Sequence, residues 1–550
     1  MDFELSSYQK DILDYFLKNP TSNMVINALA GSGKSSTACL LTEHTGTSDV
    51  YLAFNASVAE EFKHKIKNPK TKVYTMHSLG YSIMNYNLGE KAKGVKSAGF
   101  GVQRTETSSA KLDNYKIHKI IDEELNKKYG RYIDFTKRVF YKDQYFTLYN
   151  LCRLTMTSMV SMTDVNKLIQ DHCIFESFEE DVERPDIADI IVMLKAIDYK
   201  SLKQFDDSNV IDFTDMLYIT YLKIKNKEWE VPFWHLYTNI YLDEAQDNSK
   251  LQLNFLYLIK RKNGRYIIIL DKNQAIYMFS GGDAQAFSNI PKMFAPIKEF
   301  DLPICYRCAK SHLAKVNRDF GIPIKPRENA PEGFIKKIEK NEIAKYAKAG
   351  DMVISRKNKW LGSVILDLAK ASIPVYIEDK ELVANIKKVV TGFKCTTIRG
   401  LKSNLNKSIE EFNKKATEII QKKTSDDNQN QLETKIEELT TTNARIDNMN
   451  FTLEILNGYL ENNPPSTSVD RFSLYLTKLL NTTPSPSCVR VCSVHKSKGL
   501  EAPNVFVLNE GKVCFDFRNS KEQNIQEKNL SYISITRAEN GLYLVKENDA

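Results

Sequence analysis

The sequence predicts an α/β protein with two parallel sheets, each carrying a mainly helical insertion. Short apolar runs alternate with helix-like segments near both ends of the chain, which is the order of elements in a parallel sheet. Two long helix-like stretches without a strong strand pattern interrupt these regions. At 550 residues the chain is also too long for a single hydrophobic core, so several compact units are expected.

The first sheet is predicted from apolar runs in two separate parts of the N-terminal half. Ser57–Lys65 is expected as a helix between turns. We assign residues 1–84 and 206–300 to this first domain, and the helix-like residues 85–205 to an inserted subdomain. The predicted strands are Met24–Leu29, Val50–Phe54, Ile240–Leu242 and Ile267–Leu270.

The second sheet is predicted in the same way, in residues 301–389 and 481–550. Residues 390–480 are expected as a short helical insertion. Its Lys/Glu/Asn-rich part, broken near Thr424–Asn430, is expected as a solvated pair of helices. Asn481–Ser487, with two prolines, is expected as a loop. The predicted strands are Met352–Ser355, Val375–Ile377, Val489–Cys492 and Val505–Leu508.

The composition is that of a folded globular protein, with 42% apolar and 27% charged residues. No run approaches the roughly 18 apolar residues of a membrane span, and the N-terminus lacks a signal-peptide pattern, so a cytoplasmic protein is expected. The net charge of +8 permits a polyanionic partner. The nine cysteines lack a framework spacing; the pair Cys305–Cys308 is half a zinc site, and burial as small apolar side chains is favoured.

A glycine-rich segment follows the first predicted strand and opens a helix, as a phosphate-binding loop requires. Its residues are Ala28, Leu29, Ala30, Gly31, Ser32, Gly33, Lys34, Ser35 and Ser36. The glycines let backbone N–H groups close around phosphates, and the helix N-terminus adds positive potential. Lys34 is expected to reach the outer phosphates of ATP, and Ser35 to hold Mg²⁺. The strict pattern has glycine where this chain has Ala28.

Two adjacent acidic residues follow the predicted strand that ends at Leu242. Leaving Asp243 and Glu244 together at a strand end is costly unless their charge is used. Asp243 is placed to bind Mg²⁺, and Glu244 to polarise the attacking water. An acidic turn is the alternative for this motif taken alone. Together with the glycine-rich loop, the motif predicts an ATPase.

Further segments, in order along the chain, resemble the motifs of the superfamily 1 helicases similar to UvrD, Rep and PcrA. These segments are Leu5–Gln9, Ala53–Ser57, Thr75–Ser78, Asp243–Gln246, Leu270–Phe279, Tyr306–Arg307, Ser493–Glu501 and Tyr532–Ala538. The ordered set covers nearly the whole chain and is specific. The resemblance implies two RecA-like P-loop domains with ATP in the cleft between them.

This resemblance implies roles for side chains outside the glycine-rich loop. Gln9 would read the adenine edge, Tyr306 would stack on adenine, and Glu501 would hydrogen-bond the ribose. Gln274 would sense the γ-phosphate.

Two arginines complete the catalytic set that the resemblance implies. Arg307 and Arg537 would neutralise the charge that develops on the transferred phosphoryl group. Surface cations are the alternative for each of them.

The resemblance also implies contacts with nucleic acid. Bases stack on exposed rings with roughly 1–3 kcal/mol each, and short polar side chains suit phosphate oxygens. Core packing is the alternative for the rings, and a buried, internally bonded imidazole for the histidines. The candidates are Phe54, Asn55, Thr75, His77, Tyr277, Phe279, Ser493 and His495.

We therefore expect a DNA helicase or translocase that uses ATP and Mg²⁺ and travels 3′→5′ on single-stranded DNA, acting at single-strand/double-strand junctions.

The family motifs usually have glycine at Leu270, arginine at Ser280 and lysine at Ala56, so candidate contacts are missing. The short second insertion makes unwinding less secure than translocation. The alternatives are a nucleoprotein remodeller with weak unwinding, a subunit of a helicase–nuclease complex, and an inactive scaffold. A monomer or a weakly associating protein without a membrane partner is expected, with nuclease, replication or repair proteins as candidate partners.

Overall fold

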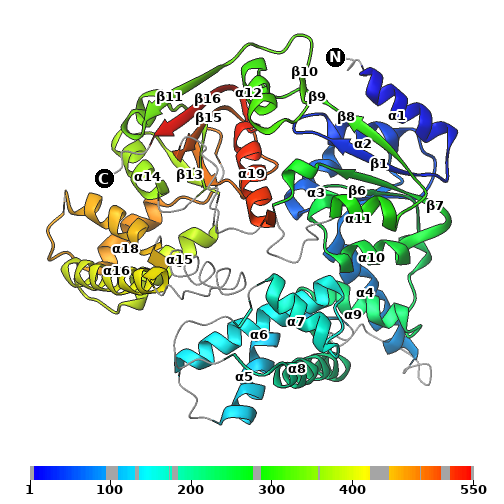
Figure 1. Cartoon of the computed structure of the whole chain (residues 1–550), viewed down its shortest axis with the longest axis horizontal. Coiled ribbons are helices and arrows are strands. Elements are labelled where there is room, and N and C mark those ends of the chain that lie inside the picture. The colour runs from blue at the N-terminus through cyan, green and yellow to red at the C-terminus, as the bar shows by residue number, and fades with distance from the viewer. Residues whose placement is uncertain are drawn as a thin grey trace. The chain divides into compact units, whose positions relative to one another are not determined.

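The computed structural model has the α/β architecture that the sequence predicts (Figure 1). It divides into two compact units, Met1–Ala28 with Gly33–Leu302, and Leu29–Ser32 with Pro303–Ala550. The structure describes residues 5–94, 109–130, 135–172, 174–175, 184–276, 286–356, 360–378, 380–421, 445–446, 448–461, 463–483, 485–509 and 521–546.

The first unit is built on a six-stranded sheet in which all neighbouring strands are parallel. In sheet order the strands are β3 (Thr71–Thr75), β2 (Asp49–Ala53), β6 (Tyr237–Leu242), β7 (Lys260–Leu270), β1 (Asn23–Ala28) and β8 (Ile297–Leu302). The four predicted strands of this sheet are confirmed. The unpredicted strands β3 and β8 lie at its two edges.

Helices cover both faces of this sheet. On one face α1 (Ser7–Lys18), α2 (Lys34–Glu43) and α3 (Ala56–Lys65) bury their apolar sides against the strands. Further helices pack their apolar residues against the other face of the sheet. The apolar layers on the two faces together hold the carboxyl ends of the strands in a row. These helices are α4 (Met76–Gly94), α9 (Asp215–Lys225), α10 (Lys250–Ile259) and α11 (Ala286–Met293).

A helical bundle with its own apolar core lies between β3 and β6 in the chain. Its helices are α5 (Lys116–Tyr129), α6 (Phe135–Thr155), α7 (Met162–Asp171) and α8 (Ile187–Ser208). At its base β4 (Lys111–Leu112) pairs in parallel with β5 (Val210–Ile211). The sequence pattern did not predict this ladder, because two residues are too few to show strand periodicity.

The second unit contains another six-stranded parallel sheet. In order its strands are β11 (Phe334–Glu339), β16 (Ala538–Lys546), β15 (Ala502–Leu508), β12 (Met352–Ser355), β14 (Val489–Ser493) and β13 (Val375–Ile377). The pair β9 (Ile304–Cys305) and β10 (Lys325–Pro326) precedes it. The helices are α12 (Lys310–Phe320), α13 (Ile343–Tyr346), α14 (Leu361–Lys370), α15 (Lys380–Gly392), α16 (Ile398–Gln421), α18 (Val469–Leu479) and α19 (Lys521–Ile535).

The prediction of a solvated helix pair after residue 400 is wrong for the helices that the structure describes. Leu401 and Leu405 of α16 are fully buried in the core of the second unit, beside Phe451 and Ile455. Charged and polar residues together outnumber the apolar residues of α16, but its apolar residues recur at helical spacing and cover one face. The predicted break near Thr424–Asn430 lies outside the described residues.

Within the part of the chain that the structure describes, no helix is both long and apolar enough to span a bilayer.

Candidate nucleotide and nucleic-acid site

The glycine-rich loop joins β1 to α2, as predicted. β1 ends at Ala28 and α2 begins at Lys34. Gly31 and Gly33 have φ angles of +65° and +82°, in the left-handed region that favours glycine. The hydroxyl of Ser32 is buried and has no hydrogen-bond partner among the described residues. A phosphate oxygen at this loop would give that hydroxyl a partner, so the loop fits the phosphates of a nucleotide.

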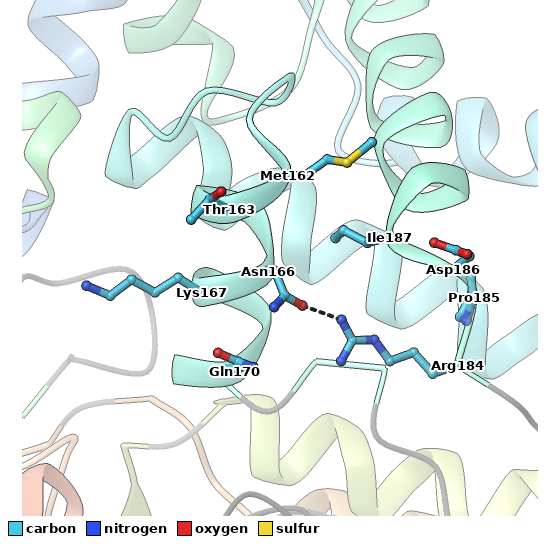
Figure 2. Close-up of a pocket in the computed structure, with 9 residues that line it drawn as sticks. All are labelled: Met162, Thr163, Asn166, Lys167, Gln170, Arg184, Pro185, Asp186 and Ile187. Atoms are coloured by element: carbon cyan, nitrogen blue, oxygen red, sulfur yellow. Dashed lines mark hydrogen bonds between the residues drawn. The ribbon is translucent and has the colours of Figure 1, made fainter.

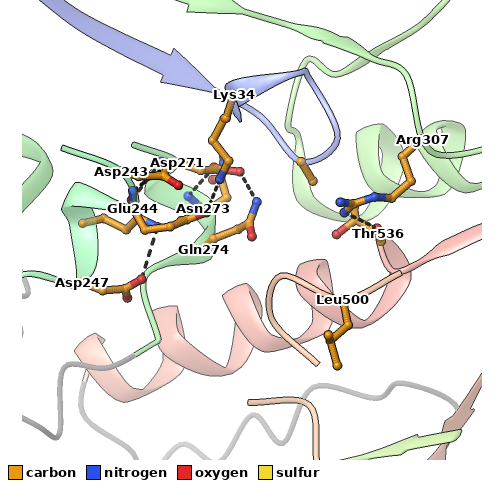
Figure 3. A network of polar contacts seen from close by, with 12 residues as sticks. Lys34, Asp243, Glu244, Asp247, Asp271, Asn273, Gln274, Arg307, Leu500 and Thr536 are labelled. Atoms are coloured by element: carbon orange, nitrogen blue, oxygen red, sulfur yellow. Dashed lines mark hydrogen bonds and ion pairs between the residues drawn. The ribbon is translucent and has the colours of Figure 1, made fainter. Parts of the chain in front are cut away.

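Lys34 lies among carboxylates of the same unit (Figure 3). Its ammonium group contacts Glu244 Oε1 at 2.5 Å. Burial acts to lower the pKa of Lys34, but the charges of Glu244, Asp271 and Asp243 outweigh it, and the net shift is upward. Lys34 is therefore held as a cation at the loop.

The carboxylates gather because parallel strands end at one edge of the sheet. Asp243 and Glu244 follow β6, and Asp271 follows the neighbouring strand β7. Glu244 has a φ of +49°, an uncommon backbone conformation for a residue with a side chain. Conformations of this kind cluster at functional sites.

Both carboxylate oxygens of Asp243 accept hydrogen bonds. The Tyr51 hydroxyl donates to Oδ2 at 2.6 Å, and the backbone N–H of Glu244 donates to Oδ1 at 3.0 Å. Burial and the charge of Glu244 raise the pKa of Asp243. The contact of Tyr51 with Asp243 is not predictable from the sequence, because β2 and β6 meet only in the folded sheet.

Gln246 connects Glu244 to the segment that follows β7, and the sequence analysis did not single it out. Its Nε2 donates to Glu244 Oε2 at 2.5 Å, and its Oε1 accepts from the Asp271 N–H at 3.1 Å. Gln274, a predicted γ-phosphate sensor, donates to Asp271 Oδ2 at 2.7 Å. The predicted residues Lys34, Glu244 and Gln274 thus belong to one hydrogen-bonded group (Figure 3).

Gln9 lies at the start of α1, where its amide is bonded within the protein. Its Oε1 accepts from the backbone N–H and the hydroxyl of Ser6, each at 3.1 Å, in a capping box. Its Nε2 donates to the Thr37 hydroxyl at 3.2 Å. The role of Gln9 at adenine stays a prediction.

In the second unit Arg307 and Glu501 form an ion pair of 2.5 Å, from Nε to Oε2. Arg307 also donates to the Thr536 carbonyl at 3.3 Å. These two predicted side chains, one assigned to the transferred phosphoryl group and one to the ribose, therefore contact each other. Tyr306 immediately precedes Arg307 in the chain.

Arg537 is 1% exposed and is bonded to oxygens of its own unit. Its Nε donates to the Ile533 carbonyl at 3.1 Å, one terminal nitrogen to the Leu500 carbonyl at 3.1 Å, and the other to the Thr536 hydroxyl at 3.2 Å. These bonds orient the guanidinium rigidly. Its action on a phosphoryl group stays a prediction.

Cys305 and Cys308 are buried in the apolar core of the second unit, as predicted for small apolar side chains. The Cys308 N–H donates to the Cys305 sulfur at 3.3 Å. In the described parts of the chain, no group of three or more His, Cys, Asp or Glu side chains is arranged to hold a metal ion.

Three predicted nucleic-acid residues lie where β2 and β3 end: Phe54 and Asn55 follow β2, and Thr75 is the last residue of β3. Phe54 is 36% exposed. Asn55 caps α3, because its Oδ1 accepts from the Val58 N–H at 2.8 Å. Thr75 accepts from the Ser78 N–H at 3.2 Å in the same manner. The polar side chains of Asn55 and Thr75 therefore have a local structural role, and their contact with nucleic acid stays a prediction.

His77 stacks on Phe213, a ring that the sequence analysis did not identify. The ring centroids are 4.1 Å apart and the planes are inclined by 24°. Phe213 is 54% exposed, so the pair presents an aromatic surface to solvent. Burial lowers the pKa of His77 to about 4, so its imidazole is neutral at neutral pH. No sequence pattern marks Phe213, because its exposure and its contact with His77 are seen only in the folded structure.

The remaining candidates lie in the second unit or outside the described residues. Ser493, which ends β14, accepts from the Lys496 N–H at 3.4 Å. Burial and the neighbouring cations lower the pKa of His495 to about 4, so it would meet a phosphate as a neutral donor. Tyr277 and Phe279, with Ser280, lie outside the described residues.

A separate cavity of about 710 Å³ lies in the helical bundle between α7 and the start of α8 (Figure 2). It contains no predicted site residue. Arg184 crosses it and donates to Asn166 Oδ1 at 2.7 Å. The lining residues are Met162, Thr163, Asn166, Lys167, Gln170, Arg184, Pro185, Asp186 and Ile187.

Comparison with known proteins adds independent evidence. Residues 10–295 match the family model of the UvrD/REP helicase N-terminal domain. A probable DNA helicase II homolog of Mycoplasma pneumoniae is 25% identical over 185 residues, which cover 32% of this chain and 25% of the relative. The ATP-dependent DNA helicase Rep of Buchnera aphidicola is 23% identical over 197 residues, covering 32% of this chain and 30% of the relative.

The chain thus spans less than a third of the length of these two relatives. A probable DNA helicase II homolog of Mycoplasma genitalium is 30% identical over 122 residues, or 20% of this chain and 16% of the relative. The family model, in contrast, matches more than half of the chain, including the glycine-rich loop and the carboxylates at the ends of β6 and β7. The chain belongs to the UvrD/REP helicase family.

Proposed function

We propose that the chain is an ATP-dependent DNA helicase or translocase that moves 3′→5′ along single-stranded DNA. The observation that carries the ATPase part is the contact of Lys34 with Glu244 beside Asp243 and Asp271, at the edge of the sheet where the glycine-rich loop begins. Membership of the UvrD/REP family and the names of the relatives support DNA as the substrate.

The residues at the loop fit ATP with Mg²⁺. Ser35 and Asp243 would hold the cation, which would neutralise charge on the phosphates when bound. The loop N–H groups, the Ser32 hydroxyl and Lys34 would hold the phosphate oxygens.

Glu244 is proposed as the base that orients and polarises the attacking water. Its Oε1 contacts Lys34, and its Oε2 accepts from Gln246. Phosphate oxygens compete with a carboxylate for the Lys34 ammonium group, so nucleotide binding would release one Glu244 oxygen for water. One oxygen of Glu244 would therefore become available to polarise water only when ATP is bound.

The second unit would supply the remaining nucleotide contacts, with Tyr306 at adenine, Glu501 at the ribose, and Arg307 and Arg537 at the transferred phosphoryl group. The existing Arg307–Glu501 ion pair would then exchange for contacts with the nucleotide. The Arg537 guanidinium is already held by three oxygens, which supports a fixed cation in place of a mobile one.

Single-stranded DNA would contact exposed rings and short polar groups of the first unit. Phe54 and the His77–Phe213 pair offer aromatic surface, which suits bases of any sequence. Junctions of single and double strands, and nuclease, replication or repair proteins in the cytoplasm, are the proposed partners.

The variants Glu244→Gln and Lys34→Ala test the catalytic assignment. The Glu244→Gln protein lacks the proposed base but keeps the phosphate loop, so we expect ATP to bind while turnover falls by at least a hundredfold. Lys34→Ala should lose turnover together with affinity for ATP. Nucleotide binding measured by fluorescence, beside phosphate release, distinguishes them. Substantial hydrolysis by either variant would place the active site elsewhere.

Strand displacement tests the direction of travel and the ability to unwind. We expect release of a labelled strand from duplexes with a 3′ tail and little release from duplexes with a 5′ tail. A preference for the 5′ tail would contradict the proposed direction. DNA-stimulated hydrolysis without strand release would identify a translocase or nucleoprotein remodeller.

A further inference from the structure

The hydroxyl of Tyr51 is one of two donors that fix the carboxylate of Asp243. Tyr51 lies on β2, which pairs in parallel with β6, and Asp243 immediately follows β6. Its hydroxyl donates to Asp243 Oδ2 at 2.6 Å, a short bond of the kind made to a charged acceptor. The Glu244 N–H donates to Oδ1 at 3.0 Å. Two donors on different elements leave the carboxyl group little freedom to rotate.

The ring of Tyr51 is itself held in place. It is fully buried and stacks face to face on Phe62 of α3, with centroids 3.4 Å apart and planes inclined by 6°. Side chains packed in this way do not leave their rotamer without disturbing their neighbours. The hydroxyl is therefore presented to Asp243 by a rigid support.

A carboxylate that is to hold a cation needs such a support. An ionised carboxylate offers about four acceptor positions, so two donated bonds leave acceptor capacity for a metal ion. Partners of a metal ligand commonly orient it and contribute to metal affinity. We propose that Tyr51 is a positioning residue that orients Asp243 toward Mg²⁺ and thereby sets the Mg²⁺ requirement of nucleotide binding. This inference rests on the proposed ATPase function.

The neighbouring strand provides a matched control. Tyr241 lies on β6 opposite Tyr51 in the register, two residues before Asp243. It is also fully buried, but its hydroxyl has no hydrogen-bond partner among the described residues. Tyr51→Phe and Tyr241→Phe each remove one oxygen from the interior of the same sheet, and only the first removes a donor to Asp243.

The experiment measures binding of a fluorescent ADP analogue to the full chain as Mg²⁺ is titrated, together with thermal unfolding of each variant. We expect Tyr51→Phe to need about tenfold more Mg²⁺ for half of the Mg²⁺-dependent gain in affinity, the lower end of the range for such partners. Affinity in EDTA should be unchanged, and Tyr241→Phe should match the wild type. The Mg²⁺ dependence of ATP hydrolysis should shift in parallel.

An unshifted Mg²⁺ requirement in Tyr51→Phe, or equal shifts in both Tyr→Phe variants, would overturn the inference while leaving the proposed function intact. Absence of any Mg²⁺-dependent nucleotide binding in the wild type would overturn the proposed function and the inference with it. If Tyr51→Phe does not fold, Phe62→Leu decides, because it keeps the hydroxyl and removes the stacked ring. We then expect a smaller shift in the same direction, and a wild-type Mg²⁺ requirement would contradict the inference.

Discussion

The imidazole of His235 lies in the interior of the first unit and is only 3% exposed. Its Nε2 lies 3.0 Å from the Ser82 hydroxyl, and its Nδ1 lies 3.0 Å from the Tyr237 hydroxyl. Burial, with a further contribution from Lys72, lowers the pKa of His235 to about 4. In an unfolded chain the pKa of a histidine imidazole is about 6.5. Below that pH the unfolded state therefore takes up a proton that the folded state does not.

The contribution of His235 to stability must consequently decrease as the pH falls from neutral toward 4. Between pH 7 and pH 5 the two pKa values correspond to a loss of about 2 kcal/mol in the free energy of unfolding. Chemical denaturation at pH 7 and pH 5 measures this loss in the free energy of unfolding. The loss should be smaller by about 2 kcal/mol in His235→Gln than in the wild type. The exposed His64 gives a control, His64→Gln, that should behave as the wild type. Equal pH dependence in all three proteins would contradict the lowered pKa of His235.

Some residues of the candidate site could be predicted from the sequence, and others could not. Lys34 and Glu244 were identified because a glycine-rich loop and an acidic strand end are local patterns. Tyr51 and Gln246 were not, because each acts through a contact between strands or segments far apart in the chain. Phe213 was missed because an exposed phenylalanine is ordinary until its stacking partner, His77, is known.

At the scale of the element, the loop between β5 and α9 carries Phe213, which stacks on His77 of α4. Because Phe213 is exposed and lies against His77, its loss removes stacking surface without opening the apolar core. We expect Phe213→Ala to weaken binding of single-stranded DNA by about 1–3 kcal/mol. Fluorescence anisotropy of a labelled oligonucleotide measures the effect. Phe233→Ala removes an exposed ring elsewhere, 71% exposed against 54% for Phe213, and should leave affinity unchanged; equal affinities of the two variants would exclude Phe213 from the interface.

A buried ion network ties the same loop to the helical bundle. Arg153 of α6 is fully buried and donates to Asp212 at 3.0 Å and to Asp215 at 2.8 Å. Lys116 of α5 contacts Asp215 at 2.7 Å. Removing one partner from a buried ion pair leaves an uncompensated charge, which typically costs about 3–5 kcal/mol.

Arg153→Met should therefore lower the free energy of unfolding by about 3–5 kcal/mol in chemical denaturation. The matched control is Lys203→Met on α8, because Lys203 pairs with Asp207 and both side chains are exposed. A surface pair contributes about 0–1 kcal/mol, so the control should change little. Comparable losses of the free energy of unfolding in the two variants would contradict a stabilising role of the buried ion network.

Buried strands formed by a continuous apolar run were predicted from the sequence, whereas the largely buried strand Ala538–Lys546, which has polar residues near its start, was not. Met352–Ser355 and Val375–Ile377 are fully buried, and continuous apolar runs matched their observed bounds. The edge strands Ile297–Leu302 and Phe334–Glu339 alternate with exposed charged residues, so no apolar run marks them. The buried face of Ile398–Gln421 was missed because composition, and not periodicity, guided that prediction.

At the scale of the whole chain, two six-stranded parallel sheets, membership of the UvrD/REP family and a net charge of +8 agree with one account. A nucleic-acid motor couples ATP hydrolysis to a change in its contacts with the strand, so its rate of ATP hydrolysis depends on nucleic acid. The proposed boundaries of the two domains and their insertions, 1–84 with 206–300, 85–205, 301–389 with 481–550, and 390–480, remain predictions.

The central claim is that nucleic acid controls hydrolysis at the Lys34–Glu244 site. The most direct test is the rate of ATP hydrolysis by the purified chain with and without single-stranded DNA, in parallel with Lys34→Ala. The account predicts strong stimulation by DNA in the wild type and no hydrolysis in the variant under either condition. A rate indifferent to single-stranded DNA, or hydrolysis that survives Lys34→Ala, would contradict it.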